Sequence, residues 1–239
     1  MHKISHLPPW NLAALRDAVE RVHNRDLSRL AYECAQSISK RQMYMKYHYA
    51  EAKRLVVTEL EGIDPEQVLM SYVLPVDTAQ YHEFHHRRLQ AEASLLALLQ
   101  CIHATADNLG HVVYYAMNFE ADPSRRIQPH RISIHSVLDL LLAGPLKNAI
   151  ANFIDDPEFK HVAAIVNCSK HRSVISASVS VSFVQDVESH GLRFDGFHYK
   201  GGWYSPRWAM QFVTAAFDAT QRHLLQVGAL LNHELGAAS

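Results

Sequence analysis

The segment 167–172 (Asn-Cys-Ser-Lys-His-Arg) concentrates polar and charged side chains at one point of the chain. An amide, an imidazole and two cations could bind a phosphate or another anion through charge-assisted hydrogen bonds. Junctions between rigid elements often carry binding groups, and we expect this segment to form a loop between a helix and a strand. Cations are also favoured at a helix C-terminus by the helix dipole, so a structural explanation stays open. The candidate ligand-binding residues are Asn167, Lys170, His171 and Arg172.

A second polar set lies at helical spacing in the middle of the chain. His103, Asp107 and His111 follow one another at intervals of four residues, so they share one face of a helix, and Asn108 lies beside them. A carboxylate between two imidazoles could bind a metal ion or orient a histidine as a base. The same stripe could instead be a solvated helix edge. His103, Asp107, Asn108 and His111 are therefore further candidate ligand-binding residues. The two histidines and Asp107 are also weak metal candidates, and we predict no cofactor.

Both sets place polar groups at the margin of an apolar pattern. We therefore predict that the polar stripe and the segment 167–172 converge on one pocket that accepts an anionic ligand.

Other polar groups could have a purely structural role. Three Glu-x-x-His spacings match two-metal helical bundles, but chance matches are expected in a chain with 17 histidines. These are Glu20 with His23, Glu83 with His86, and Glu158 with His161.

Aromatic and charged residues also alternate near the Gly201-Gly202 pair. Exposed aromatics among cations can stack on nucleic-acid bases, but the same residues could pack the hairpin onto the helices. Packing is the favoured interpretation at this point. The residues concerned are Arg193, Asp195, His198, Tyr199 and Trp203.

Composition narrows the class of protein. A net charge of −1 over 239 residues argues against a protein that coats nucleic acid generally, although a local basic patch remains open. Three widely spaced cysteines favour a reducing compartment. The N-terminus shows no secretory signal, and no apolar run is long enough to span a bilayer. We expect a cytoplasmic protein with no membrane contact. P-loop, Rossmann, nucleophile-elbow and zinc-finger motifs are absent from the sequence.

Hydrophobic periodicity predicts mostly helices. Helices are expected over 12–38 and 42–60, with a stop at Gly62 to Pro65, and a short one over 66–72. The clearest is a long helix over 78–118, capped by Asp77 or Thr78, whose apolar positions keep the mixed three-and-four spacing of a buried face. Those positions are Leu95, Leu98, Ile102, Ala106, Leu109, Val113 and Ala116.

The second half of the chain adds shorter elements. Helices are expected over 133–143, from Pro145, and from Pro157 to about Cys168. Serine and apolar residues alternate over 173–184, which predicts a half-buried strand, with an antiparallel partner over 191–199. Ser205-Pro206 should cap a last helix. The predicted fold is mainly α: one domain (1–239), a helical bundle around a long central helix, with a β-hairpin at about 173–200 inserted before the C-terminal helix.

The long helix with its polar stripe, the Asn-x-x-Lys-His-Arg segment, the strand and the Trp-bearing approach to the last helix resemble bacterial helical proteins of the HEPN type, over about residues 78–235. The resemblance implies a helical bundle, often dimeric, and RNA cleavage or nucleotide binding in toxin or phage-defence systems. The family signature, an Arg, a polar residue and a His a few positions on, is not found at Arg172. It fits Arg16 with His23 and Arg41 with His48, outside the resembling stretch.

The leading functional expectation is a helical protein that binds a nucleotide or RNA, in its most specific form a ribonuclease-like toxin or phage-defence component. A homo-oligomer, in particular a homodimer, is expected. Two alternatives stay open: a non-catalytic structural or interaction protein, and a metal-dependent hydrolase. Catalytic residues, the substrate and the pathway are not specified by the sequence.

Overall fold

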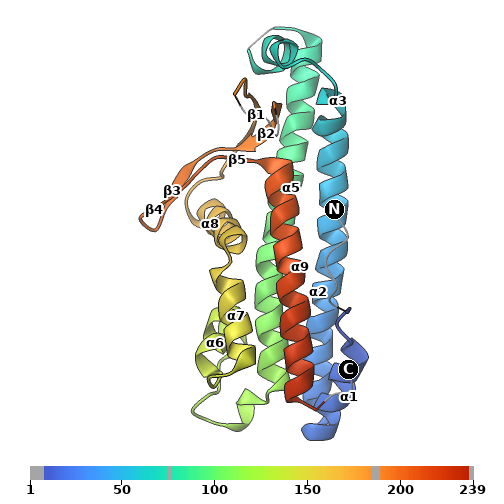
Figure 1. Cartoon of the computed structure of the whole chain (residues 1–239), viewed down its shortest axis with the longest axis vertical. Helices are drawn as coiled ribbons and strands as arrows, with labels where there is room; N and C mark the ends of the chain where they lie inside the picture. Colours follow the sequence, from blue (N-terminus) through green and yellow to red (C-terminus); the bar gives the residue numbers. More distant parts are fainter. Residues whose placement is uncertain (1–7, 75–76, 185–188, 237–239) are drawn as a thin grey trace. The chain divides into compact units, whose positions relative to one another are not determined.

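A computed structural model describes residues 8–74, 77–184 and 189–236 (Figure 1). It is 71% helical with a small antiparallel sheet before the C-terminal helix, which confirms the predicted mainly α class. Across these described residues, no helix combines the length and apolar character that crossing a bilayer requires.

The chain forms two compact units, each assembled from separate segments. Unit 1 comprises Met1–Met43, Ile102–Lys160 and Ala216–Ser239, and unit 2 comprises Tyr44–Cys101 and His161–Ala215. The division falls inside four helices, so each of them contributes residues to both units. The expectation of a single domain stays a prediction, and each unit is described by itself.

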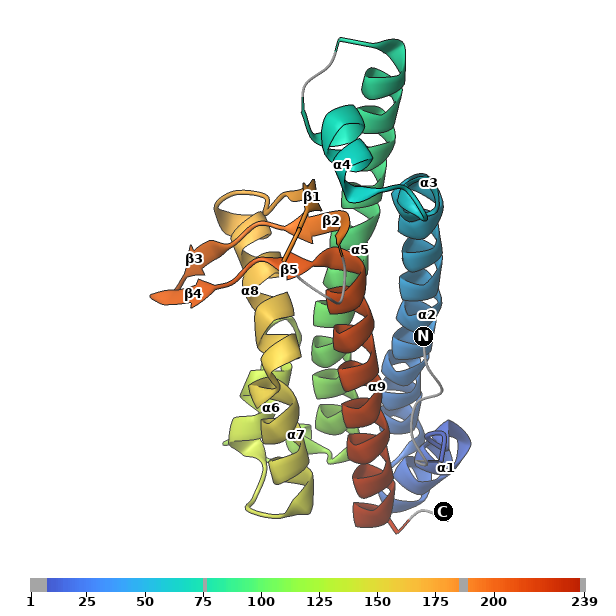
Figure 2. The same ribbon diagram turned by 45° about the horizontal axis from the view of Figure 1, so that its top comes forward.

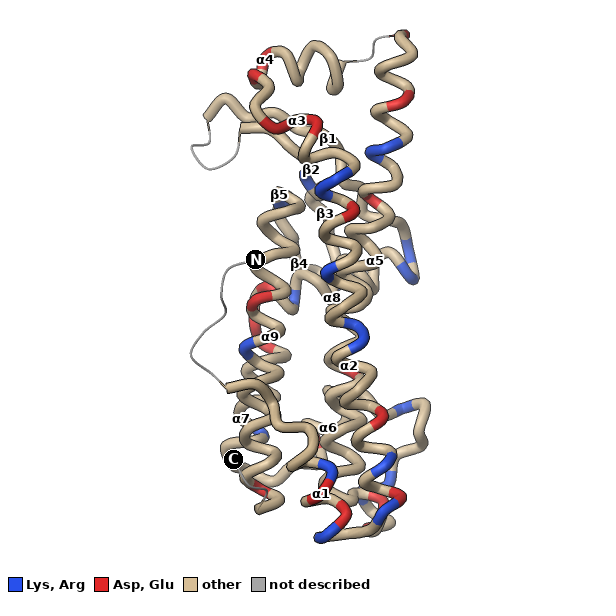
Figure 3. Tube along the Cα trace, turned by 90° about the vertical axis from the view of Figure 1, so that its right-hand side faces the viewer, with Lys and Arg blue, Asp and Glu red and all other residues tan. Residues whose placement is uncertain are grey.

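The N-terminal helices differ from the sequence prediction. Helix α1 spans Leu12–Val22 and helix α2 spans Arg25–Ala52, so the chain breaks at residues 23–24 and not after Ile38. The break is stabilised by Asn24, whose side chain accepts a hydrogen bond from the Leu27 backbone N–H at 2.9 Å. Asn24, a residue type that commonly caps helices, is the only sequence signal for this break, because neither proline nor glycine lies at residues 23–24. Charges of both signs lie along α1 (Figure 3).

The next segments of unit 2 follow the prediction more closely. Helix α2 continues as the π-helical segment η1 (Lys53–Val57) and α3 (Thr58–Leu60), and Gly62 then takes a left-handed conformation with φ of 79°. Such a φ favours glycine. Helix α4 (Pro65–Val68) and the π-helical segment η2 (Leu69–Val73) occupy the expected short helix.

Helix α5 is the predicted long helix and spans Ala79–Ala116. Thr78 caps it by accepting a hydrogen bond through Oγ1 from the Tyr81 N–H at 3.2 Å. Gly110 is required by close packing within unit 1, since a Cβ there would lie 2.7 Å from backbone atoms of Ser133 and Ile134. All seven positions of the predicted apolar face are buried: Leu95, Leu98, Ile102, Ala106, Leu109, Val113 and Ala116.

Short helices follow α5, and the two predicted proline starts are present. After the 3-10 turns η3 (Phe119–Ala121) and η4 (Pro129–Arg131), helix α6 begins behind a Ser133 cap, α7 begins with Pro145, and α8 with Pro157. Helices α6 and α7 lie side by side in unit 1 (Figure 2). One prediction is wrong: α8 reaches His171, so residues 167–171 are helical and not a loop. The bounds are Ile134–Leu140, Pro145–Asp155 and Pro157–His171.

The sheet is richer than the single predicted hairpin. Strands β1 (Ala177–Val181), β2 (His190–Phe194) and β5 (Arg207–Trp208) form an antiparallel sheet in the order β1-β2-β5. A separate hairpin joins β3 (Phe197–Tyr199) to β4 (Gly202–Tyr204). The predicted partner over 191–199 is thus divided between β2 and β3. The expected turn at 185–188 lies outside the described residues.

Burial along β1 matches the expected alternation only in part. Ala177 and Val179 are buried and Ser178 and Ser180 are half-buried, whereas the expected inward position Phe183 is 63% exposed. The last helix, α9 (Ala209–Glu234), begins later than expected because residues 207–208 form β5, so Ser205-Pro206 do not cap it.

Strand β1 is an edge strand, and two α5 side chains hold it. Glu92 Oε1 accepts a hydrogen bond from the Ala177 N–H at 3.3 Å, and Arg88 Nη1 donates to the Ala177 carbonyl at 3.1 Å. Arg88 also donates to Glu92 Oε2 at 3.1 Å. The two partly buried charges pair with each other and with backbone, which is how buried charges are normally tolerated.

Candidate functional site

The end of α8 meets the β3–β4 hairpin within unit 2. Arg172, the first residue after α8, donates a hydrogen bond through Nη1 to the His198 carbonyl of β3 at 3.1 Å. Lys170, His171 and Arg172 are all exposed, whereas Asn167 is half-buried one turn earlier in α8. Three of the four predicted residues therefore lie together on a solvent-facing surface.

Trp203 is the most unusual side chain of this surface. It is 58% exposed, although tryptophan is normally largely buried. It lies opposite His198 across the β3–β4 hairpin, and the two rings are tilted by 53° with centroids 4.8 Å apart. The predicted packing of Trp203 onto the helices is therefore wrong. Its indole presents a large part of its area to solvent.

Gly196 determines where the Trp203 indole lies. A Cβ at Gly196 would be 2.6 Å from the Trp203 ring atoms Cη2 and Cζ2, and 3.0 Å from Pro206. Real Cβ atoms do not approach other heavy atoms so closely, so only glycine permits this ring position. The missing side chain of Gly196 thus makes room for one edge of the indole, while much of the ring stays accessible.

Cationic residues belong to the same hairpin and to the end of α8 that contacts it. We call the hairpin surface the set Lys170, His171, Arg172, His198, Lys200 and Trp203, all of which are exposed. Lys200 Nζ lies 5.5 Å from the Tyr199 ring centroid, within the range of a cation–π contact. The acidic residue nearest in the hairpin sequence, Asp195, is also exposed. The surface offers cationic and aromatic groups side by side.

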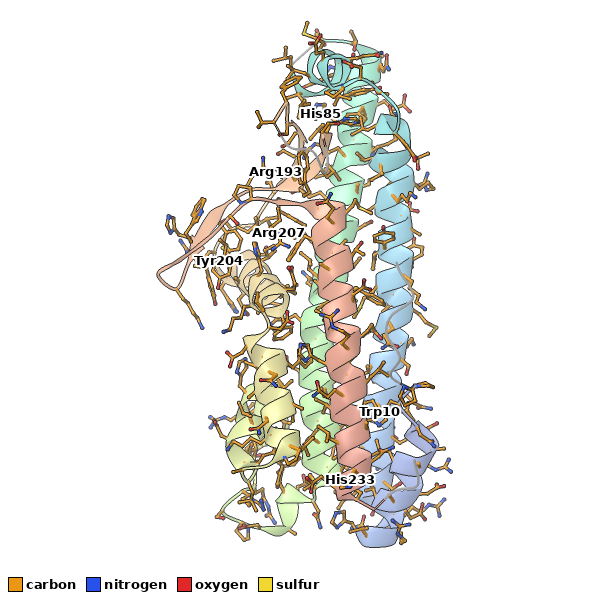
Figure 4. All side chains as sticks on the ribbon, viewed as in Figure 1. Trp10, His85, Arg193, Tyr204, Arg207 and His233 are labelled. Atoms are coloured by element: carbon orange, nitrogen blue, oxygen red, sulfur yellow. The ribbon has the colours of Figure 1, made fainter. Side chains whose placement is uncertain are left out.

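His161 supports the hairpin from its buried side. This α8 residue is 7% exposed and its ring contacts an aromatic cluster, with centroids 5.9 Å from Phe197, 5.2 Å from Tyr204 and 4.8 Å from Phe212. Figure 4 shows Tyr204 and Arg207 in this region. Burial, and to a smaller extent the positive charge of Arg207, lowers the pKa of His161 to about 4. The imidazole is therefore neutral near pH 7 and acts as a packing group.

The polar stripe of α5 lies in unit 1, where several of its members contact other residues of that unit. Asn108 Oδ1 accepts a hydrogen bond from Arg41 Nε at 2.7 Å, and the His103 ring stacks on Phe159 with centroids 6.3 Å apart. Burial lowers the pKa of His111, while the carboxylate of Asp107 opposes this shift. His111 therefore favours its neutral form, and all four stripe residues are half-buried.

The stripe and the segment 167–172 belong to different units, so their predicted convergence on one pocket stays a prediction. Among the described residues, no group of three or more His, Cys, Asp or Glu side chains is placed to hold a metal ion. In one of the Glu-x-x-His pairs, Glu83 Oε1 lies 4.0 Å from Arg87 Nε. The histidine of that pair, His86, lies with its Nε2 3.2 Å from Gln90 Nε2.

Of the two Arg-to-His spacings of the HEPN signature, Arg41 and His48 lie within α2, whereas Arg16 lies in α1 and His23 follows its end. Arg16 forms two hydrogen bonds with Asp17, and His23 Nε2 lies 3.1 Å from the Ala116 carbonyl. Arg41 is engaged with Asn108. Each of these three side chains therefore contacts another residue of the protein.

Three features of the structure were not predicted from the sequence: the contact of Arg41 with Asn108, the burial of the His161 ring, and the close approach of Trp203 to Gly196. Arg41 and Asn108 are 67 positions apart, so no local pattern connects them. Gly196 carries a usable signal, because an isolated glycine between strands often marks a close backbone approach. No family model, curated protein or solved structure matches this chain. Its function must therefore be inferred from its own geometry.

Proposed function

We propose that the protein binds single-stranded RNA or a nucleotide on the hairpin surface. The single observation that carries the proposal is Trp203, a 58% exposed indole with one edge beside Gly196. Base–aromatic stacking contributes about 1–3 kcal/mol per base in proteins that bind single strands. An aromatic ring has few rotatable bonds, so it loses little conformational entropy when a base stacks on it.

The surrounding cations suit a phosphate backbone. Lys170, Arg172 and Lys200 can each contact a phosphate, and Arg172 is oriented by its hydrogen bond to the His198 carbonyl. The whole chain has a net charge of −1, so the attraction must be local to this surface. A short segment of a few nucleotides, or a single nucleotide, therefore fits better than an extended duplex.

The proposal concerns binding and assigns no cleavage residue. Arg16 and His23, which fit the HEPN spacing, lie in unit 1 and contact Asp17 and a backbone carbonyl. The hairpin surface does hold two exposed imidazoles, His171 and His198, but no contact between them is observed among the described residues. Binding without chemistry is the simplest activity that this arrangement supports.

The test is fluorescence anisotropy with labelled single-stranded RNA of about twelve nucleotides at two or more salt concentrations. Trp203→Ala should weaken binding roughly 5- to 100-fold, the effect of losing one stacked base. Trp203→Phe should retain part of the affinity. Lys200→Ala should reduce the slope of log K against log salt by about 0.7, the value for one phosphate contact on a single strand.

Matched control variants distinguish RNA binding at the hairpin surface from nonspecific RNA binding. Tyr47 is a 63% exposed aromatic residue on α2, and Lys46 beside it is an exposed cation. Tyr47→Ala and Lys46→Ala should leave RNA affinity unchanged. If these controls weaken binding as much as Trp203→Ala and Lys200→Ala, the hairpin surface is not the site. If wild-type protein binds neither RNA nor a nucleotide, the proposal is wrong.

A further inference from the structure

Unit 1 contains a cavity that nothing in the proposed function uses. It has a volume of about 250 Å³ and lies where α6 ends, α7 begins and the chain leaves α5. Its walls include Phe119, Leu141 and Leu146, each less than 10% exposed, while Leu142 at the same site is 81% exposed. The cavity is thus mainly apolar inside and carries an apolar side chain that faces solvent.

Two cations lie at this cavity and are held by the same helix end. Lys147 Nζ donates to the Leu141 carbonyl at 2.8 Å, and Arg125 Nη2 donates to the Leu140 carbonyl at 3.4 Å. The Arg125 guanidinium also lies 4.6 Å from the Phe119 ring centroid. An ammonium has three donors and a guanidinium has five, so both retain free donors after these contacts. Both positive charges are oriented before any ligand arrives.

The charge balance at the cavity selects a particular head group. Glu234, which is exposed, also lines the cavity, so two cations face one carboxylate and leave a single positive excess. A monoanion neutralises that excess, whereas a dianion would exceed it. A carboxylate also matches the planar geometry of a guanidinium.

The volume limits the size of the ligand. One water occupies roughly 30 Å³ in the liquid, so a cavity of about 250 Å³ has space comparable to about eight waters. A carboxylate with about eight carbons in total has about ten non-hydrogen atoms. This number is close to that of the waters it would replace. Its hydrocarbon part would replace water against the apolar walls.

We propose that this cavity binds a medium-chain monocarboxylate, with its carboxylate at Lys147 and Arg125 and its hydrocarbon chain against Phe119, Leu141 and Leu146. The site is distinct from the hairpin surface, which lies in unit 2. The ligand is a free small molecule in solution and not a lipid within a bilayer.

Isothermal titration calorimetry of the full chain with sodium octanoate, below its micellar concentration, tests the proposal. Octanoate should bind at least tenfold more tightly than acetate, which lacks the chain, and than octanol, which lacks the charge. Octylammonium should bind less tightly than octanoate. If octylammonium binds equally well, the cations do not select the ligand and the proposal is wrong. The same holds if the chain associates with anionic phospholipid vesicles but shows no affinity for octanoate.

Variants test the assignment of the two charges. Lys147→Met should weaken octanoate binding about tenfold or more, and Lys147→Arg should largely preserve it. Glu234→Gln, at an exposed position that should not affect folding, should tighten binding about two- to threefold by removing the repelling charge. Lys160→Met is the matched control, because Lys160 is an exposed cation of unit 1 that pairs with Asp155 at 2.8 Å. Its octanoate affinity should equal that of the wild type.

Three results would overturn this site: an unchanged affinity in a folded Lys147→Met protein, an equal loss in Lys160→Met, or weaker binding in Glu234→Gln. Thermal unfolding of each variant shows whether it is folded. Trp203→Ala should keep full octanoate affinity, since its side chain belongs to the hairpin surface. Failure of RNA binding and failure of octanoate binding are therefore distinguishable in the same set of proteins.

Discussion

The polar stripe of α5 and the hairpin surface are both collections of polar side chains, but they are used differently. In the stripe, Asn108 accepts a hydrogen bond from Arg41, and His103 stacks on Phe159. On the hairpin surface, Trp203 and Lys170 face solvent. Polar groups that meet partners inside the protein stabilise the fold, whereas exposed groups held in a fixed geometry remain free to bind. Residue type alone does not distinguish the two cases.

The largest expected effect contrasts the stripe with the apolar side of the same helix. Leu109 is fully buried in unit 1, next to Asn108 in the sequence. Leu109→Ala should reduce the free energy of unfolding by about 2–5 kcal/mol, the usual cost of truncating a core leucine. Urea denaturation measures the change. A loss well below 1 kcal/mol would mean that this side of α5 contributes little and that the contrast with the stripe does not hold.

The next prediction concerns the buried side of the hairpin. His161 is neutral in the folded state down to its pKa of about 4, whereas in the unfolded chain it takes up a proton near pH 6.5. Stability is therefore unaffected above pH 6.5, falls as the pH drops from 6.5 to about 4, and loses nothing further from this group below that. The loss should total roughly 3 kcal/mol.

His161→Phe, which keeps an aromatic ring in the cluster, should remove this part of the pH dependence. The measurement is the free energy of unfolding by urea at pH 7, 5.5 and 4.5, compared between variant and wild type. His135→Gln, at an exposed position, should keep the wild-type slope. Parallel curves for wild type and His161→Phe would show that burial of this ring is not what makes stability depend on pH.

Arg41 should matter for stability and not for binding. Arg41→Met leaves Asn108 Oδ1 without its donor and should cost about 1–3 kcal/mol in chemical denaturation. Arg29→Met, which breaks an exposed ion pair with Glu33, should cost less than about 1 kcal/mol. RNA affinity should be unchanged in both proteins. A loss of RNA binding in folded Arg41→Met would instead assign the stripe to the site.

Gly196→Ala gives the smallest effect and the finest test of the hairpin surface. The added methyl cannot coexist with the observed ring position, so the Trp203 indole must move while every binding side chain is kept. RNA affinity should fall roughly three- to tenfold, equivalent to about 1 kcal/mol of stacking. Anisotropy measures the affinity, and thermal unfolding should shift little. Unchanged affinity would mean that the ring position is unimportant.

Elements that local rules determine agree with their prediction from the sequence. The long helix, its buried face and its Thr78 cap follow from spacing and cap chemistry, as do the helix starts at Pro145 and Pro157. The prediction was wrong where a single capping residue competed with a continuous apolar helical periodicity. The apolar spacing continued across Asn24, so the break between α1 and α2 was placed too late.

The candidate site was predictable only in part. Lys170, His171 and Arg172 are exposed, but they end a helix and do not form a loop. The exposure of Trp203 depends on strands β3 and β4 forming their own hairpin and on the contact with Gly196. An isolated glycine can hint at a close approach, but its partner depends on the tertiary structure and cannot be read from spacing along the chain. The same holds for Arg41 and Asn108.

The pair of α5 side chains that holds β1 also bears on the protein's behaviour at high concentration. An edge strand is a template on which another molecule can add a strand, and natural sheets protect such edges. Here the N–H and C=O of Ala177 are already bonded to Glu92 and Arg88, so an incoming chain finds both groups occupied at the start of the strand. We therefore expect the ion pair to hinder edge-to-edge association at this end of β1. Substitutions at Glu92 or Arg88 should accordingly reduce solubility on storage.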